Sequence, residues 1–330
     1  MALPTLVVGA VVVSASGAAN IGRRLQSGRP TWLVLAVGFE LVSAFGFVAT
    51  FQLVFGEWLP RRLSVRMGLA VCAATIVIPA GGLVAIGFGA RALRKRGMPG
   101  AKTRARAIAL LLITNAPNLI ALGLLGVALG TGLLDGPHAP ILTIVPAAVA
   151  LSAIGLTISL PTVSRQRVTR APLTTARRVV SLVAKQLELG VIEARALLGG
   201  RSWRLLGAVA YYAFDNAVLW ATFTAFGHTD PPVATLAMAY LIGSAAGSLP
   251  IPAGIGVVEG GMVGLLVVFG APAICAGIAV LAYRAVSLGV PLAVGGVAFL
   301  TLGQPTRHRR LSPQAAGPGV HGSTGHAHAG

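Results

Sequence analysis

Charged residues are scarce in this chain, and acidic ones are the scarcest. Asp and Glu number 8 among 330 residues, and all charged residues together make up 10% of the sequence. An average soluble domain carries about 25% charged residues, and a membrane-spanning helix needs roughly 20 apolar residues. Here 55% of the residues are hydrophobic and several apolar runs approach or exceed that length. The composition excludes an ordinary soluble domain and predicts an all-α polytopic membrane protein.

Cysteine is nearly absent as well. Cys72 and Cys275 lie in apolar runs far apart in sequence, in no arrangement typical of a metal or redox motif. The predicted spans contain no Cys/His ligand cluster and no Ser/His/Asp set, so we expect no cofactor, no metal and no hydrolase activity. His321, His326 and His328 lie in a tail, residues 303–330, that is rich in Gly and Pro and is expected to be disordered.

Basic residues outnumber acidic ones, and the net charge is +18. In a soluble protein this would indicate a nucleic-acid partner, but here Lys and Arg gather between the apolar runs. Anionic lipid headgroups and the positive-inside rule account for them there, so no nucleic-acid binding is expected. Segments 56–66, 91–106, 161–204 and the tail are predicted to face inside, and the three arginines of 22–29 are the exception. The high Gly and Ala content favours a bacterial plasma (inner) membrane.

The apolar runs predict a series of helices. Their expected ranges are 3–19, 32–55, 63–78, 83–96, 105–134, 140–160, 203–226, 233–249, 257–269 and 273–302. The segment 173–198 differs, because apolar residues recur at helical spacing while charged residues fall between them. That pattern is typical of one amphipathic helix that lies in the membrane interface.

The least regular apolar stretch, residues 249–261, reads LPIPAGIGVVEGG. Pro250 and Pro252 cannot lie within an uninterrupted helix, and Gly254 and Gly256 allow close backbone approach or unusual dihedrals. A broken backbone survives at membrane depth only where protein or a water-filled cavity satisfies its polar groups. The stretch therefore predicts a helix break inside the membrane, and it places Glu259 beside that break.

Two motifs of the second half recur in the first. The run Pro79-Ala80-Gly81 matches Pro252-Ala253-Gly254, and Gly97-x-Pro99 matches Gly270-x-Pro272 at the same offset. We therefore predict a single transmembrane domain over 1–302, with repeat halves at about 30–134 and 203–302 that are linked by 140–200. The distribution of basic residues favours about six transmembrane helices plus two re-entrant helical hairpins, arranged as inverted repeats.

Glu259 and Arg284 are the leading candidates for a binding site. A carboxylate and a guanidinium within hydrocarbon lower their desolvation cost by pairing, and such a pair could exchange partners with a phospholipid phosphate and a headgroup amine. Arg suits phosphate because its planar fork binds bidentately. Tyr283 is a candidate hydrogen-bond donor beside them, with ordinary packing as the favoured interpretation, and Gly254 and Gly256 would shape the adjacent backbone. A permanent structural salt bridge is the alternative.

Glu40 and Asp215 each lie within the first predicted span of a repeat half. Both could line the same cavity and attract a cationic headgroup. Hydrogen bonding between helices, with Asn216 or Asn115 as partner, explains them equally well.

The second half resembles the transmembrane region of lysylphosphatidylglycerol synthases and their stand-alone, flippase-like relatives. The resemblance is carried by Pro252-Ala253-Gly254-Ile255-Gly256-Val257-Val258-Glu259, then Gly270-x-Pro272, then Ala282-Tyr283-Arg284. It implies translocation of a phospholipid or modified phospholipid between leaflets, without the aminoacyl-transfer chemistry of a soluble synthase domain. In the first half residues 83–89 are apolar, so a matching polar site is not expected there.

Two other functions stay open. One is a membrane-embedded transferase that uses a lipid-linked donor. The other is a non-transporting membrane partner of a lipid-modifying enzyme, which would dock on the basic face and the amphipathic helix. Membrane phospholipids are the expected partners of the main hypothesis, and the sequence does not indicate an oligomeric state.

Overall fold

The computed structural model describes residues 28–77, 93–94, 97–134, 136, 139–166, 175–200, 202–226, 232–246 and 256–302. Within these ranges the regular structure is helical throughout, which confirms the predicted all-α class. Several predicted features lie outside the described residues: the span 3–19, the break at 79–82, nearly all of 83–96, the turn that includes Gly254, and the tail.

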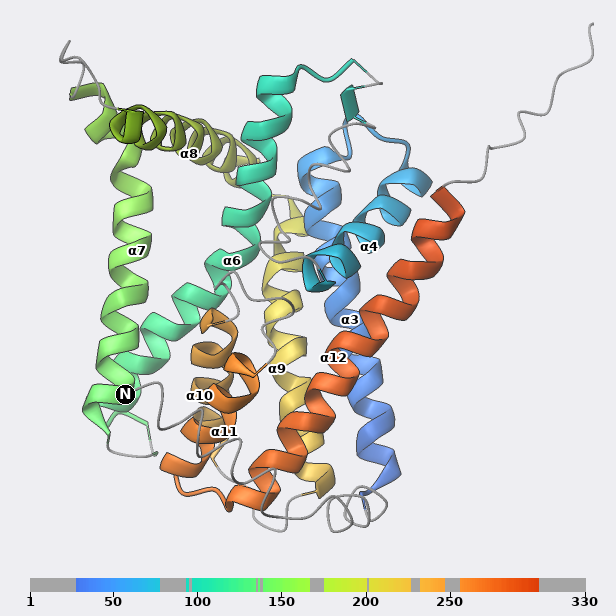
Figure 1. Cartoon of the computed structure of the whole chain (residues 1–330), viewed down its shortest axis with the longest axis vertical. Helices are drawn as coiled ribbons and strands as arrows, with labels where there is room; N and C mark the ends of the chain where they lie inside the picture. Colours follow the sequence, from blue (N-terminus) through green and yellow to red (C-terminus); the bar gives the residue numbers. More distant parts are fainter. Residues whose placement is uncertain are drawn as a thin grey trace, which may run out of the picture.

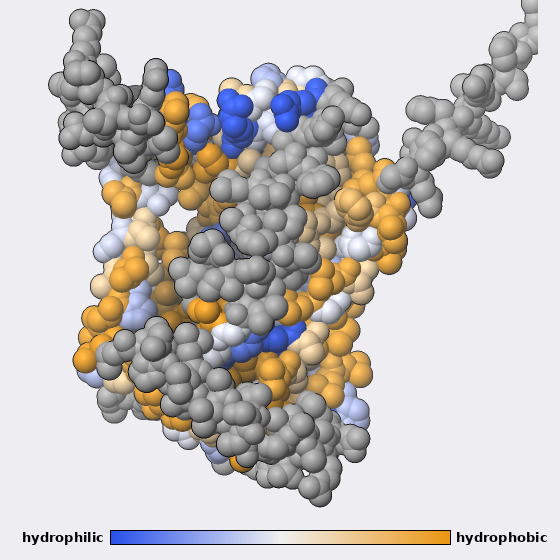
Figure 2. Space-filling view, viewed as in Figure 1, coloured by the Kyte–Doolittle hydropathy of each residue, from blue (hydrophilic) through white to orange (hydrophobic). Residues whose placement is uncertain are grey.

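Four helices are long and apolar enough to cross a membrane: α3 (Pro30–Phe55), α6 (Gly100–Gly130), α7 (Pro140–Gln166) and α12 (Ala273–Leu302). A fifth helix, α9 (Leu206–Phe226), follows the short 3-10 turn η1 (Trp203–Leu205) and runs beside α3 (Figure 1). Figure 2 shows hydrophobic residues over the flanks of the molecule and hydrophilic residues at its upper end. These features describe an integral membrane protein.

The amphipathic segment forms α8 (Thr175–Gly199), which lies across the upper ends of α6 and α7 (Figure 1). Val191 and Ala194 are buried, whereas Leu182, Val183 and Leu198 expose about half of their surface. The exposed leucines and valine give α8 an apolar surface that is free to meet lipid.

Three shorter helices enter from the two ends of the molecule. Helix α4 (Arg61–Val77) begins at the upper end in Figure 1, whereas α10 (Val233–Ala246) begins and α11 (Val257–Val268) ends at the lower end. Helices α10 and α11 pack side by side and extend about halfway up the molecule. This is the course that a re-entrant hairpin predicts for the second half.

The two Gly-x-Pro motifs adopt the same local structure. Gly97 and Gly270 have φ values of 84° and 93°, in the left-handed region that favours glycine. In each case the glycine amide and the following amide donate to carbonyls of the preceding turn, as in a helix C-cap. Proline then precedes the first turn of α6 or α12, where its missing donor does no harm. The predicted helix stop is confirmed at Gly270, whereas most of the helix predicted before Gly97 lies outside the described residues.

Helices α3 and α9 run in opposite directions and touch along their length. The Arg29 amide donates to the Ala225 carbonyl at one end, and Gly46 and Gly207 meet near the other. Helix α3, and η1 with α9, begin the proposed repeat halves. The interval from Pro30, which begins α3, to Trp203, which begins η1, equals the interval from Gly100 to Ala273. Equal spacing combined with opposite direction is what an inverted repeat predicts.

Candidate functional site

Glu259 and Arg284 form an ion pair between α11 and α12. Glu259 lies in the first turn of α11, and its Oε1 atom is 2.7 Å from Nε of Arg284. Its Oε2 accepts a hydrogen bond of 2.6 Å from the Gly256 amide, one of the donors that a helix N-terminus leaves unsatisfied. Gly256 has φ of 86° and so permits the abrupt turn into α11. The predicted pairing of Glu259 with Arg284 is confirmed.

The ion pair is only partly shielded. The Arg284 side chain exposes 13% of its surface and that of Glu259 exposes 20%. Figure 2 shows a hydrophilic patch among hydrophobic residues in the middle of the molecule, where α11 and α12 meet. A small ligand group can therefore reach this pair from outside the bundle, whereas a fully buried pair would be closed to it.

Asp215 accepts two phenolic hydrogen bonds. Its Oδ2 atom receives the hydroxyl of Tyr240 at 2.7 Å and that of Tyr283 at 3.1 Å. Both tyrosines are almost fully buried, and their rings meet edge to face. Ordinary packing was the favoured interpretation of Tyr283, but its hydroxyl makes a specific hydrogen bond, and the acceptor is Asp215 and not the Glu259–Arg284 pair. Arg284 is near enough to interact electrostatically with this carboxylate.

The Glu40 and Asp215 carboxyls meet where α3 and α9 cross. The two carboxyls interact electrostatically and lie near enough to share a hydrogen bond, and Glu40 exposes only 3% of its surface. Glu40 Oε2 and Asp215 Oδ1 are buried and receive no donor from the described residues. The alternative partner Asn115 pairs elsewhere, because its Oδ1 accepts the Tyr212 hydroxyl at 2.7 Å and its amide donates to the Leu111 carbonyl. The alternative prediction that Asn115 is the hydrogen-bond partner of Glu40 or Asp215 is therefore wrong.

Six of the seven predicted site residues are thus connected, and five of them link four helices through their side chains. Glu40 on α3 contacts Asp215 on α9, Asp215 contacts Tyr283 on α12, and the next residue, Arg284, contacts Glu259 on α11. Gly256 joins them through its amide, and Gly254 lies outside the described residues. Tyr240 was not predicted from the sequence. A tyrosine in the helix that follows the one carrying the intramembrane Asp215 would have been the indication.

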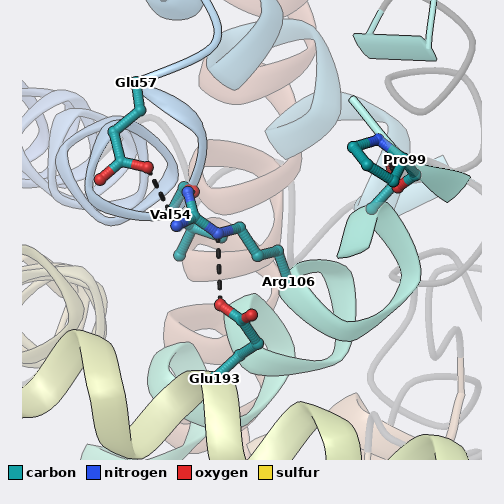
Figure 3. Close-up of polar contacts among 6 residues, drawn as sticks. Val54, Glu57, Pro99, Arg106 and Glu193 are labelled. Atoms are coloured by element: carbon teal, nitrogen blue, oxygen red, sulfur yellow. Dashed lines mark hydrogen bonds and ion pairs between the residues drawn. The ribbon is translucent and has the colours of Figure 1, made fainter. Parts of the chain in front are cut away.

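A second polar cluster fixes α8 to the bundle (Figure 3). Arg106 of α6 is buried and donates to the Val54 carbonyl at 2.8 Å, to Glu57 at 3.0 Å and to Glu193 of α8 at 3.3 Å. The sequence indicated only that Arg106 belongs to a basic segment. Its burial and its partners depend on contacts between distant parts of the chain, for which the sequence has no local signal.

These observations define an α-helical integral membrane protein with a polar, acid-rich site between its helices. The family described as the lysylphosphatidylglycerol synthase TM region matches residues 2–295, and the chain belongs to this family. Membership relates the protein to lipid modification or translocation at the membrane. Comparison with individually curated proteins gives no match.

Proposed function

We propose that the protein translocates phospholipid headgroups between leaflets, as a flippase- or scramblase-like transporter. The observation that supports this best is the partly exposed Glu259–Arg284 pair at the hydrophilic patch between α11 and α12. Charged side chains at membrane depth are costly, and they mark substrate pathways more often than they mark inert structure. The lipid tails would stay in the bilayer while the headgroup passes along this patch.

The chemistry of the pair suits a phospholipid headgroup. A guanidinium binds phosphate through two parallel hydrogen bonds, and a carboxylate binds an ammonium group. When a zwitterionic headgroup enters, its phosphate can replace Glu259 as the partner of Arg284. Its amine can replace Arg284 as the partner of Glu259. No charge is left unpaired in this exchange, so the headgroup avoids the several kcal/mol that an isolated buried ion would cost.

The start of α11 supports the same exchange. The Gly256 amide, which donates to Glu259, lies at the N-terminus of α11, where the helix dipole is positive, next to the ion pair. If Glu259 turns toward an amine, the phosphate finds both a cation and an amide donor nearby. The site can therefore accept a phosphate without creating an unsatisfied backbone donor.

A liposome assay tests the proposal. Purified protein is reconstituted with phospholipid labelled on its headgroup, and the label in the outer leaflet is reduced chemically to measure exchange. Loss of one charge-assisted hydrogen bond, worth about 1.5–3 kcal/mol, corresponds to roughly tenfold or more in rate. We therefore expect Glu259→Gln and Arg284→Ala each to slow lipid exchange at least tenfold.

Matched controls are available on the same chain. Glu188→Gln on α8 and Arg104→Ala, at an exposed position of α6, remove the same charges away from the site and should transport like wild type. If the two site variants melt earlier but exchange lipid at the wild-type rate, the pair is a structural salt bridge and the proposal is wrong. Chemical analysis of the same lipids would reveal a transferase instead, because a new lipid product would form.

A further inference from the structure

We infer that Glu40 and Asp215 form a proton-binding site that holds one shared proton at rest and takes up a second when an anionic headgroup binds Arg284. This inference rests on the proposed function and names the ion that accompanies the lipid. It goes beyond the headgroup site, since neither carboxyl is part of the Glu259–Arg284 ion pair.

A hydrogen bond between these two neighbouring carboxyls would require a proton, which is the first of the two protons in this inference. An ionised carboxylate can only accept hydrogen bonds, so two ionised groups in contact would have no donor between them. Glu40 Oε2 and Asp215 Oδ1 are buried and receive no donor from the residues that the structure describes. One proton held between the carboxyls supplies the missing donor and removes the repulsion of two like charges.

Among the described residues, no other side chain donates a hydrogen bond to either of these two oxygens. Several titratable or charged side chains interact electrostatically with one or both carboxyls: Cys72 of α4, Tyr211 and Tyr212 of α9, Tyr240 of α10, and Tyr283 and Arg284 of α12. Tyr240 and Tyr283 donate to Asp215 Oδ2, not to Oδ1. Arg284 is the positively charged member of this set, and Glu259 of α11 occupies its Nε atom.

Charge balance links the pair to the lipid. At rest the positive charge of Arg284 faces Glu259 on one side and the singly protonated acid pair on the other. An anionic headgroup brings one negative charge and no cation, so the site gains a net negative charge. A second proton from water on the acid pair restores the balance, and it returns to water when the headgroup leaves. A zwitterionic headgroup brings its own cation and needs no second proton.

Infrared spectroscopy of the purified protein tests the shared proton without any transport. A protonated carboxyl has a C=O stretching band that is distinct from that of a carboxylate and shifts in heavy water. We expect this band in wild type at neutral pH, and we expect its loss in both Glu40→Gln and Asp215→Asn. The control Glu188→Gln should keep it. Absence of the band in wild type, or its loss only in Glu259→Gln, would overturn the inference, and so would its removal by sodium at constant pH.

Proton uptake tests the link to the headgroup. Phosphatidylglycerol is added to detergent-solubilised protein in weakly buffered solution, and the pH change is recorded. Wild type should take up protons with phosphatidylglycerol but not with phosphatidylethanolamine, and Glu40→Gln should lose this uptake. Equal uptake with both lipids would refute the charge-balance argument. If the infrared band is present but liposomes show no lipid exchange, the proposed function fails while the shared proton stands.

Discussion

Substituting Gly207 tests the helix contact that brings the two acids together. An alanine Cβ at Gly207 would lie 2.5 Å from the Gly46 carbonyl oxygen, 2.9 Å from Ala49 Cβ and 3.1 Å from Thr50 Oγ1. The nearest atom belongs to the backbone and cannot turn aside. Ordinary contact begins at 3.4 Å, so α3 and α9 must move apart by almost an ångström at this point.

The expected cost follows from two opposing effects. Overpacking of a tight interface costs about 1–3 kcal/mol, and the backbone clash places Gly207→Ala toward the upper part of this range. Replacing a helical Gly with Ala recovers about 0.5–1 kcal/mol. We therefore expect a net loss of about 1–2 kcal/mol, measured as a lower midpoint of thermal unfolding in mild detergent. Gly46→Ala should behave alike, and the double variant should cost less than the sum because both touch one contact.

Gly38→Ala is the matched control for this substitution. Gly38 lies on the same helix as Gly46, and a Cβ there would meet nothing within 4 Å. The Gly38→Ala variant should be at least as stable as wild type. Because separation of α3 from α9 also moves Glu40 away from Asp215, Gly207→Ala should weaken the protonated-carboxyl band as well. Equal melting temperatures for Gly207→Ala and Gly38→Ala would refute the close approach of the helices.

Three further substitutions probe other contacts by thermal unfolding. Arg106→Met removes the polar contacts that hold α8 to the bundle and should cost about 1–3 kcal/mol of stability. This is less than the loss of a fully buried ion pair costs, because the acidic partners of Arg106 reach water. The exposed control Arg104→Met should leave the unfolding midpoint unchanged, and equal effects of the two variants would contradict a stabilising role of Arg106. Tyr240→Phe keeps the ring but removes a phenolic donor, so it should cost about 1–2 kcal/mol, and an unchanged midpoint would show that the bond is not made. Gly270→Ala forces a side chain into the left-handed region and should cost about 1–2 kcal/mol, whereas Gly277→Ala, within α12 and with open space around it, should not destabilise.

Features with a local chemical cause could be predicted from the sequence. Gly97-x-Pro99 and Gly270-x-Pro272 end helices because glycine accepts the left-handed conformation and proline begins the next turn. Glu259 and Arg284 were predicted to pair because a lone charge at membrane depth is too costly. Both arguments need only residue types and their place within apolar runs, which the sequence shows directly.

Contacts that depend on how two helices align could not be predicted. Glu40 and Asp215 were each expected in the first span of a repeat half, but nothing in either span specifies that their carboxyls touch. That contact follows from the antiparallel register of α3 and α9, which the close approach of Gly46 and Gly207 helps to fix. Small residues at such crossings are a known feature of membrane helices, yet many glycines of this chain face open space. The sequence alone does not indicate which of them lies at a crossing.

The position of Tyr283 and Arg284 on α12 determines how the two halves of the site can communicate. Consecutive helical residues point about 100° apart, so one helix presents Tyr283 to Asp215 and Arg284 to Glu259 at the same level. A headgroup that draws Glu259 away from Arg284 need not disturb the Tyr283 bond, because Glu259 belongs to α11 and the Tyr283 bond joins α12 to α9. Rotation of α12, by contrast, would change both contacts at once. A helix shared in this way lets the acid pair respond to the charge on Arg284 over a short distance, with no chain of intermediate residues.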